Sequence, residues 1–140
     1  MALTYVTLTH QKLGQLLNAC TIWLSRPPAE QPERFAYAVR KVRGAAQGLW
    51  QNYIEQVEDI QVKHAEEAGG VLKRDDKGNL EYSKSAFLVR NRELRALSQT
   101  KVEIPAHFVK IESVPADLTA DELDAFEGIL IQVVNTPPEA

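Results

Sequence analysis

Cysteine is nearly absent from this 140-residue chain, and the one that is present, Cys20, cannot form a disulfide within it. Cys20 lies in the apolar segment LLNACTIWL, which favours a buried, unreactive thiol in a reducing compartment. No apolar run approaches the ~18 residues of a membrane-spanning helix. The N-terminal segment also lacks the basic leader and apolar block of a signal peptide. We therefore expect a cytoplasmic protein with no membrane partner.

An excess of positive charge is missing as well. The 16 Lys and Arg residues are outnumbered by 19 Asp and Glu residues, which gives a net charge of −3. Because general nucleic-acid binding usually needs a basic surplus, we do not expect direct binding to DNA or RNA. The hydrophobic content of 44% is ordinary for a globular protein. The length predicts one domain over residues 1–140, with a flexible tail at about 135–140.

Residue patterns that carry out catalysis or bind metal ions are also missing. The DDKGN segment, residues 75–79, places Lys77 where a calcium loop needs an oxygen ligand, so we interpret it as a turn. Adjacent carboxylates such as Asp121 and Glu122 fall at predicted helix starts or on helix surfaces. The histidines, none of which has another His or Cys at metal-ligand spacing, are His10, His64 and His107. We expect no enzyme, and no catalytic, cofactor-binding or metal-binding residue.

The dominant feature of the chain is a long helical pattern from Pro32 to Ala68. Apolar positions recur there in steps of three and four, close to the coiled-coil period. They are Phe35, Val39, Val42, Ala46, Leu49, Tyr53, Val57, Ile60 and His64. A helix of about 55 Å cannot cover its own apolar stripe, so we expect another helix or another molecule to lie along it. His64 on this stripe is interpreted as a hydrogen-bonded residue at the edge of the core.

Two glycines, Gly44 and Gly48, lie in the middle of this helix. A glycine inside a helix costs roughly 1 kcal/mol relative to alanine, so both need a reason. The first hypothesis is that they let another backbone approach closely, within the chain or from another molecule. A kink and a ligand-contact site are the alternatives.

Shorter elements flank the long helix. A strand is predicted at residues 3–9 and an amphipathic helix at 10–25. A turn region at 69–83 is expected to reverse the chain, so that a helix at 84–98 lies antiparallel to the long one. Residues 100–114 alternate between apolar and polar and are expected to pair with the N-terminal strand.

Local signals mark the helix starts. Thr9 and either Ser83 or Ser85 suit N-caps, and Thr119 with Glu122 three residues later forms a capping box that begins a final helix. Three residues of the helix at 84–98 are expected to share one face: Phe87, Leu94 and Leu97. On the final helix the residues expected to face inward are Leu123, Phe126 and Leu130.

Three points complete the predicted fold. Gly69 and Gly70 are expected to end the long helix, and the turn at 75–79 either closes a hairpin or forms a loop. The pattern does not decide whether residues 129–134 are helix or strand. The fold class predicted is α+β, mostly helical: a long helical hairpin with a small antiparallel β element.

Basic residues form two groups, one on the long helix and one on the helix at 84–98. If these helices are antiparallel, one hypothesis is that the groups join into one positive face that binds phosphate or an acidic protein surface. An ordinary solvated surface is the simpler alternative. The second half of the long helix is acidic, and opposite patches of this kind favour protein recognition. The residues that we predict to bind a partner are Arg40, Arg43, Arg90 and Arg92.

The order of these elements resembles a group of small, poorly characterised proteins of tailed bacteriophages. The segments that carry the resemblance are LTHQKLGQLLNAC, PERFAYAVRKVRGAAQGLWQNY, KGNLEYS, KVEI and LTADELDAFEGIL. The resemblance implies a non-enzymatic phage protein that binds and modulates a host protein assembly in the host cytoplasm, with host RNA polymerase as the first candidate. Its alternative implication is a component of virion morphogenesis, in tail or neck assembly. It supplies no functional residues.

Overall fold

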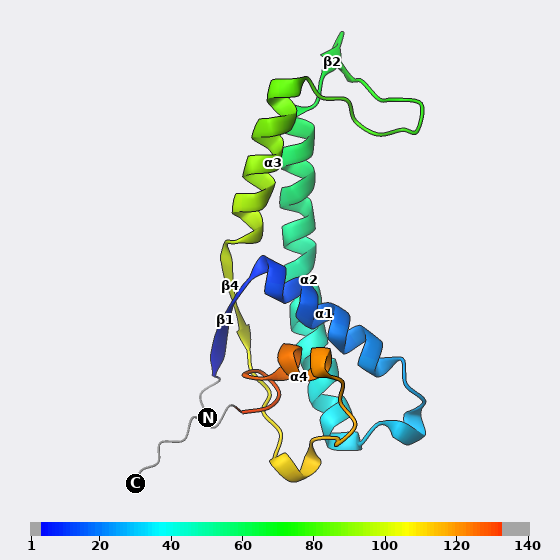
Figure 1. The fold of residues 1–140 in the computed structure, drawn as a ribbon, viewed down its shortest axis with the longest axis vertical. Coiled ribbons are helices and arrows are strands. Elements are labelled where there is room, and N and C mark those ends of the chain that lie inside the picture. Colours follow the sequence, from blue (N-terminus) through cyan, green and yellow to red (C-terminus); the bar gives the residue numbers. More distant parts are fainter. Residues whose placement is uncertain (1–3, 133–140) are drawn as a thin grey trace.

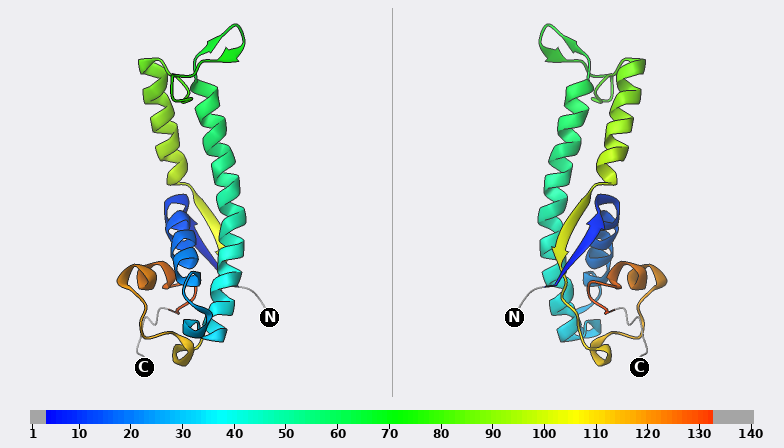
Figure 2. Two further views of the ribbon diagram at one scale, coloured as in Figure 1. Left: turned by 90° about the vertical axis from the view of Figure 1, so that its right-hand side faces the viewer. Right: turned by 90° about the vertical axis from the view of Figure 1, so that its left-hand side faces the viewer.

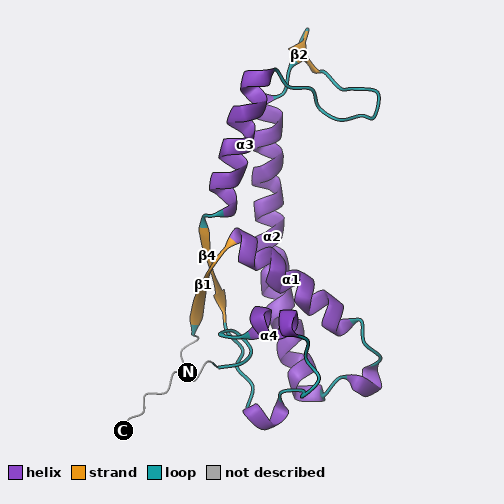
Figure 3. Cartoon of the chain, viewed as in Figure 1, coloured by secondary structure: helices purple, strands orange, loops and turns teal. Residues whose placement is uncertain are grey.

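One long helix, α2 (Glu33–His64), is the spine of the molecule in the computed structural model, which describes residues 4–132 (Figure 1). The elements around its first half form what we call the base. They are β1 (Tyr5–Thr9), α1 (His10–Leu24), β4 (Lys101–Pro105) and α4 (Ala120–Phe126). α3 (Lys84–Ser98) runs antiparallel beside its second half, and we call this helix pair the stalk (Figure 2). Helices dominate and the sheet is small, so the predicted fold class is confirmed (Figure 3).

The long helix is continuous, as the sequence predicts. Its 32 residues span about 48 Å, and it passes through Gly44 and Gly48 without a break. It ends at His64, four residues earlier than expected, because Ala65 takes an extended conformation. The prediction that Gly69 and Gly70 end this helix is therefore wrong.

These two glycines instead form the tip of a small hairpin between β2 (Glu67–Ala68) and β3 (Val71–Leu72). Gly69 and Gly70 have φ angles of 61° and 84°, which a two-residue hairpin turn of this kind requires. The predicted turn at 75–79 does form, closed by a single antiparallel bridge on its flanks. Two short turns thus occupy the end of the stalk.

The predicted pairing of the N-terminal strand with the 100–114 segment is confirmed. β1 and β4 run antiparallel, with Tyr5 opposite Pro105 and Thr9 opposite Lys101. Proline cannot donate to a strand ladder, and Pro105 accordingly ends β4. This ribbon lies beside α2 and joins the N-terminal strand to the segment that follows α3 (Figure 1).

The hydrophobic core lies in the base. Phe35 of α2 lies at its centre, with its ring centroid 5.0 Å from that of Trp23 and 5.8 Å from that of Phe126. The other large side chains that are fully buried there include Leu13, Leu16, Cys20, Val39, Val42, Ile104, Ile129 and Leu130. On α2 the buried residues lie between Phe35 and Ala46, and α3 has none.

Two residues of the predicted apolar faces are largely exposed. Phe87 of α3 is 44% exposed and Leu123 of α4 is 42% exposed, whereas Leu94 and Leu97 are half-buried. α3 packs mainly against α2, with a smaller contact to α1, so only part of its apolar face is covered. Periodicity identifies residues that share a face but does not say how much of that face a neighbour covers.

The sequence leaves close packing at Gly44 and Gly48 open between a contact within the chain and one with another molecule, and the contact within the chain does not occur. A Cβ atom at either position would meet no heavy atom within 4 Å, so both face open space. The close approach occurs at Gly14 of α1, where a Cβ atom would lie 2.9 Å from the ring of Trp50. α1 crosses α2 at this point, and any side chain at position 14 would displace the indole.

The last helix starts at the predicted capping box. Thr119 and Glu122 exchange both capping hydrogen bonds, and α4 ends at Phe126. Gly128, with a φ of 85°, then turns the chain, and a single parallel bridge joins Glu127 to Ile131. Residues 129–132 are neither helix nor strand. Residues 133–134 and the predicted tail at about 135–140 lie outside the described residues.

Candidate functional site

An open groove of about 590 Å³ lies between the first turns of α2 and the segment that follows β4. This segment includes a short 3₁₀ helix, η2 (Ile111–Ser113). We call this cleft the basic groove. Its lining residues are Glu33, Arg34, Tyr37, Arg40, Phe108, Val109, Lys110 and Ser113.

The two aromatic side chains of the basic groove face outward for separate reasons. Tyr37 is 49% exposed because its neighbours Ala36 and Ala38 occupy the buried side of α2. Phe108 is 39% exposed. The backbone N–H groups on both sides of it, of His107 and Val109, donate to Ile129 O and Leu130 O at 2.9 and 3.0 Å. Alternation along this extended segment turns Phe108 away from the core.

The basic groove is positively charged. Arg34, Arg40 and Lys110 line it, while Glu33 is the one acidic residue of its lining. The ion pairs found among residues 4–132 involve none of these four side chains. Next to the groove, Lys41 Nζ lies 5.4 Å from the ring centroid of Tyr37, within cation–π range. Exposed aromatic rings beside arginine are typical of protein-binding hot spots.

The four residues predicted from the sequence to bind a partner have different settings. Arg40 is exposed and lines the basic groove, and Arg92 is exposed on α3. Arg43 is half-buried, and its Nε is buried without a hydrogen-bond partner in the described chain. Arg90 is half-buried, with its guanidinium carbon 4.6 Å from the ring centroids of both Tyr82 and Phe87.

The structure does not bring these four arginines onto one face. α3 lies beside the second half of α2, and Tyr82, over which Arg90 stacks, donates its hydroxyl to Gln61 O. Along α2, Gln61 is about 27 Å from Arg43. The expected joint positive face is therefore absent, and Arg40 and Arg90 belong to two separate surfaces.

A second groove, of about 850 Å³, lies between β1, α1 and α4. Its acidic side chains come from the last helix and its end: Asp121, Glu122, Asp124 and Glu127. Glu122 is only 4% exposed, so its charge needs local compensation.

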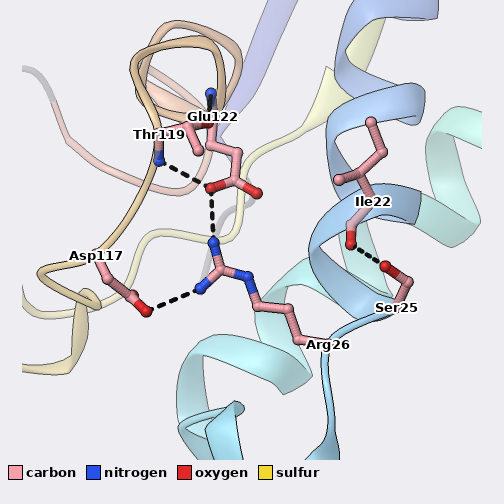
Figure 4. A network of polar contacts seen from close by, with 6 residues as sticks. All are labelled: Ile22, Ser25, Arg26, Asp117, Thr119 and Glu122. Carbon is pink, nitrogen blue, oxygen red and sulfur yellow. Dashed lines mark hydrogen bonds and ion pairs between the residues drawn. The ribbon is translucent and has the colours of Figure 1, made fainter.

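That compensation comes from Arg26, which the sequence analysis did not single out (Figure 4). Glu122 Oε1 accepts hydrogen bonds from Thr119 N at 2.9 Å and from Arg26 Nη2 at 3.1 Å. The other arm of Arg26 donates to Asp117 at 3.0 Å. One oxygen of the Glu122 carboxylate thus joins α4 to the end of α1. Glu122 therefore has a structural role. The sequence shows its capping box with Thr119, but no local pattern shows its pairing with Arg26, which is distant in the chain.

Two histidines bind the α3 region: His10 from α1 and His64 from α2. His10 is buried, stacks on Tyr53 and has Nδ1 at 2.8 Å from Thr100 Oγ1 and 3.2 Å from Leu97 O. Because Leu97 O can only accept, Nδ1 carries the proton. His64 lies 2.9 Å from Glu93, which confirms its predicted place as a hydrogen-bonded residue at the core edge.

Burial raises the pKa of the Cys20 thiol to about 12, with Arg43 acting in the opposite direction. The thiol is therefore protonated near neutral pH, as expected for an unreactive buried cysteine. In the part of the chain that the structure describes, no group of three or more His, Cys, Asp or Glu side chains is placed to hold a metal ion. Within residues 4–132, no helix is both long and apolar enough to cross a membrane.

Comparison of the chain with protein-family models, with curated proteins and with solved structures finds no match.

Proposed function

We propose that this chain is a protein-binding module that docks on a larger protein assembly through the basic groove. The observation that supports this proposal is the meeting of two exposed aromatic rings, Tyr37 and Phe108, with three cations that have no acidic partner in the described chain. Aromatic and arginine side chains dominate the binding energy of protein interfaces.

The chemistry of the groove defines the partner segment. Arg34, Arg40 and Lys110 favour acidic side chains, and the rings of Tyr37 and Phe108 favour an apolar or aromatic anchor between them. The occupant is therefore an acidic segment with at least one apolar side chain. Complementary charge of this kind speeds association and sets orientation, while the apolar anchor supplies affinity.

The resemblance to tailed-bacteriophage proteins directs the choice of partner. On that basis we propose host RNA polymerase, in the cytoplasm of the infected cell, as the first assembly to test. The second candidate is a virion part in tail or neck assembly. It is favoured by strongly exposed apolar residues at both ends of the molecule, Val71 at the stalk end and Ile111 in the base, because a building block contacts several neighbours.

A pull-down from extract of the host bacterium tests the proposal, with the tagged full chain as bait and RNA polymerase subunits detected by immunoblot. We expect Tyr37→Ala and Arg40→Glu to reduce recovery about tenfold, the effect of losing one hot-spot side chain. Lys77→Glu is the matched control, because it makes the same charge change in an exposed turn far from the groove. Equal recovery by Arg40→Glu and Lys77→Glu would remove the groove from the interface.

Mass spectrometry of purified virions separates the two candidates. A chain that acts on RNA polymerase is expected to be absent from the particles and to be recovered with the enzyme. Recovery in the particles, with no polymerase in the pull-down, would assign the groove to virion assembly instead.

A further inference from the structure

The free end of the stalk carries a second preorganised group of side chains, separate from the basic groove. It consists of Tyr82, Phe87, Arg90 and Asn91, and we call it the tip cluster. Its residues lie just before α3 and along the first half of this helix, which begins after the two turns (Figure 1). The cluster is attached to α2 at Gln61. Along the helix, Gln61 is about 27 Å from Arg43, a basic residue of α2 that is predicted to bind a partner.

Arg90 is held in one orientation. Its guanidinium carbon is 4.6 Å from the centroids of both the Tyr82 and the Phe87 ring, and these rings meet edge to face at 6.4 Å. Arg90 Nε and Nη2 both donate to Asn91 Oδ1, at 3.0 and 2.6 Å. The Tyr82 hydroxyl donates to Gln61 O at 2.9 Å and so fixes the cluster to α2. A side chain that is already fixed loses little entropy when it binds.

The charge of Arg90 is not neutralised within the described chain. The one acidic residue of α3, Glu93, is engaged by His64 at 2.9 Å and by Lys63 at 3.6 Å. Asn91 is neutral and occupies only two of the five guanidinium N–H donors. The Nη1 group and the second Nη2 proton stay available as a fork, which matches the two oxygens of a carboxylate.

Apolar surface lies beside this fork. Phe87 is nearly half exposed, and Val62, which follows the residue that binds Tyr82, is 48% exposed. The arrangement therefore offers a ligand both a charged and an apolar contact.

We propose that the tip cluster is a second docking surface, which binds a protein segment that presents a carboxylate next to an apolar side chain. The carboxylate pairs with the free fork of Arg90, and the apolar side chain packs on Phe87. The tip cluster shares no residue with the basic groove, so a result that rejects one binding proposal leaves the other standing. When the tip cluster and the basic groove are both occupied, α2 acts as a rigid bridge between the two acidic segments that bind them. Affinity then rises because the two contacts act together.

Surrounding charge favours a peptide over a nucleic acid. Glu81 precedes Tyr82 in the chain, and Glu58 is exposed on α2 one turn before Gln61. A polynucleotide places a phosphate at every residue and would meet these carboxylates. A segment with one carboxylate at Arg90 avoids them.

The experiment is an NMR titration of the isotope-labelled full chain. The probe is an N-acetylated, C-amidated hexapeptide of alternating Asp and Leu. We expect the Arg90 Nε–H signal and the Tyr82 and Phe87 ring signals to shift, with a Kd in the millimolar range that suits a single fork. The same peptide with Asn in place of Asp is expected to shift them far less. An Arg40→Glu background reverses one charge of the basic groove, and the shifts at the tip are expected to persist there.

Arg90→Lys keeps the charge but loses the planar fork, so we expect about tenfold weaker binding of the Asp peptide at the tip. Arg92→Lys is the matched control and is expected to bind like the parent chain. Unchanged amide signals along α3 and in the base verify that Arg90→Lys is folded. No shift at the tip with the Asp peptide, or equal binding by Arg90→Lys, overturns the proposal. Stronger shifts with a single-stranded thymidine octanucleotide also overturn it and assign the cluster to nucleic acid.

Discussion

At the scale of single residues, three glycines in helices differ in the space around their Cα atoms. Gly14 lies against the ring of Trp50, whereas Gly44 and Gly48 on α2 face open space. A glycine is needed only at the first position, and the sequence alone does not distinguish these cases. The helical pattern draws attention to the two on α2, because they weaken the longest helix. Gly14 carries no such signal, because its contact with Trp50 depends on how two helices cross.

We predict that Gly44→Ala and Gly48→Ala each raise the free energy of unfolding by about 1 kcal/mol, because alanine is the better helix former and has room at both positions. Gly14→Ala is expected to lower it by about 1–3 kcal/mol, since the Trp50 indole must move. Urea denaturation monitored by circular dichroism measures all three. A loss of stability in Gly44→Ala would show that this face of α2 is covered in solution.

The pair formed by His64 and Glu93 gives the stalk a pH dependence. The hydrogen bond from His64 holds the pKa of Glu93 below its usual value of 4.5, and Lys63 acts in the same direction. A depressed carboxyl pKa stabilises the fold fully above pH 4.5, and this contribution is lost as the pH falls through the lower folded-state value.

We therefore predict that Glu93→Gln lowers the Tm at pH 6, and that the difference from the parent chain shrinks below pH 4.5. Calorimetry between pH 3 and about pH 7 measures the Tm difference between the variant and the parent chain. Glu112→Gln, a change at an exposed acid with no ion pair in the described chain, is the matched control and is expected to show no such trend. A constant Tm difference across this range would exclude the pair as the cause.

At the scale of elements, local signals predict helix starts well. Thr9, Ser83 and Thr119 each cap a helix with a side-chain hydrogen bond, as expected from the residue type and the pattern that follows. The same kind of signal fails at Gly69 and Gly70, because positive φ suits both a helix end and a hairpin tip. The choice between them depends on where α2 ends.

The candidate site could be predicted only in part. Arg40 was recognised from its charge and its place on an exposed helix face. Tyr37 and Phe108 were missed, because a groove arises only when the segment after β4 docks beside α2. The orientation of Phe108 comes from hydrogen bonds to residues 129–130, which no local pattern reveals.

The junction between α1 and α4 depends on Arg26. We predict that Arg26→Ala lowers the free energy of unfolding by about 3 kcal/mol, because it leaves the nearly buried Glu122 without its cation. Asp117→Asn, which removes only the exposed partner, is expected to cost less than about 1 kcal/mol. Chemical denaturation of both variants gives the comparison. Similar losses in the two would mean that the buried ion pair is not what holds the junction.

At the scale of the whole molecule, the base and the stalk differ in packing. The core residues of α2 end at Ala46, and beyond it both stalk helices have only half-buried contacts. We predict that amides of α3 and of residues 50–64 exchange hydrogen through local opening at a lower free energy than those of residues 35–46. Native-state hydrogen exchange by NMR measures this order. Equal protection along α2 would mean that the stalk unfolds only together with the base.

The central claim is that the basic groove binds a partner protein. Photo-cross-linking in the host cell tests it directly, with p-benzoylphenylalanine in place of Phe108 and, as the control, in place of Tyr5, which is exposed on β1. The account predicts an adduct with a host or virion protein from position 108, with none from position 5, and loss of the adduct when Arg40→Glu is added. An adduct from position 5 with none from position 108 would contradict it.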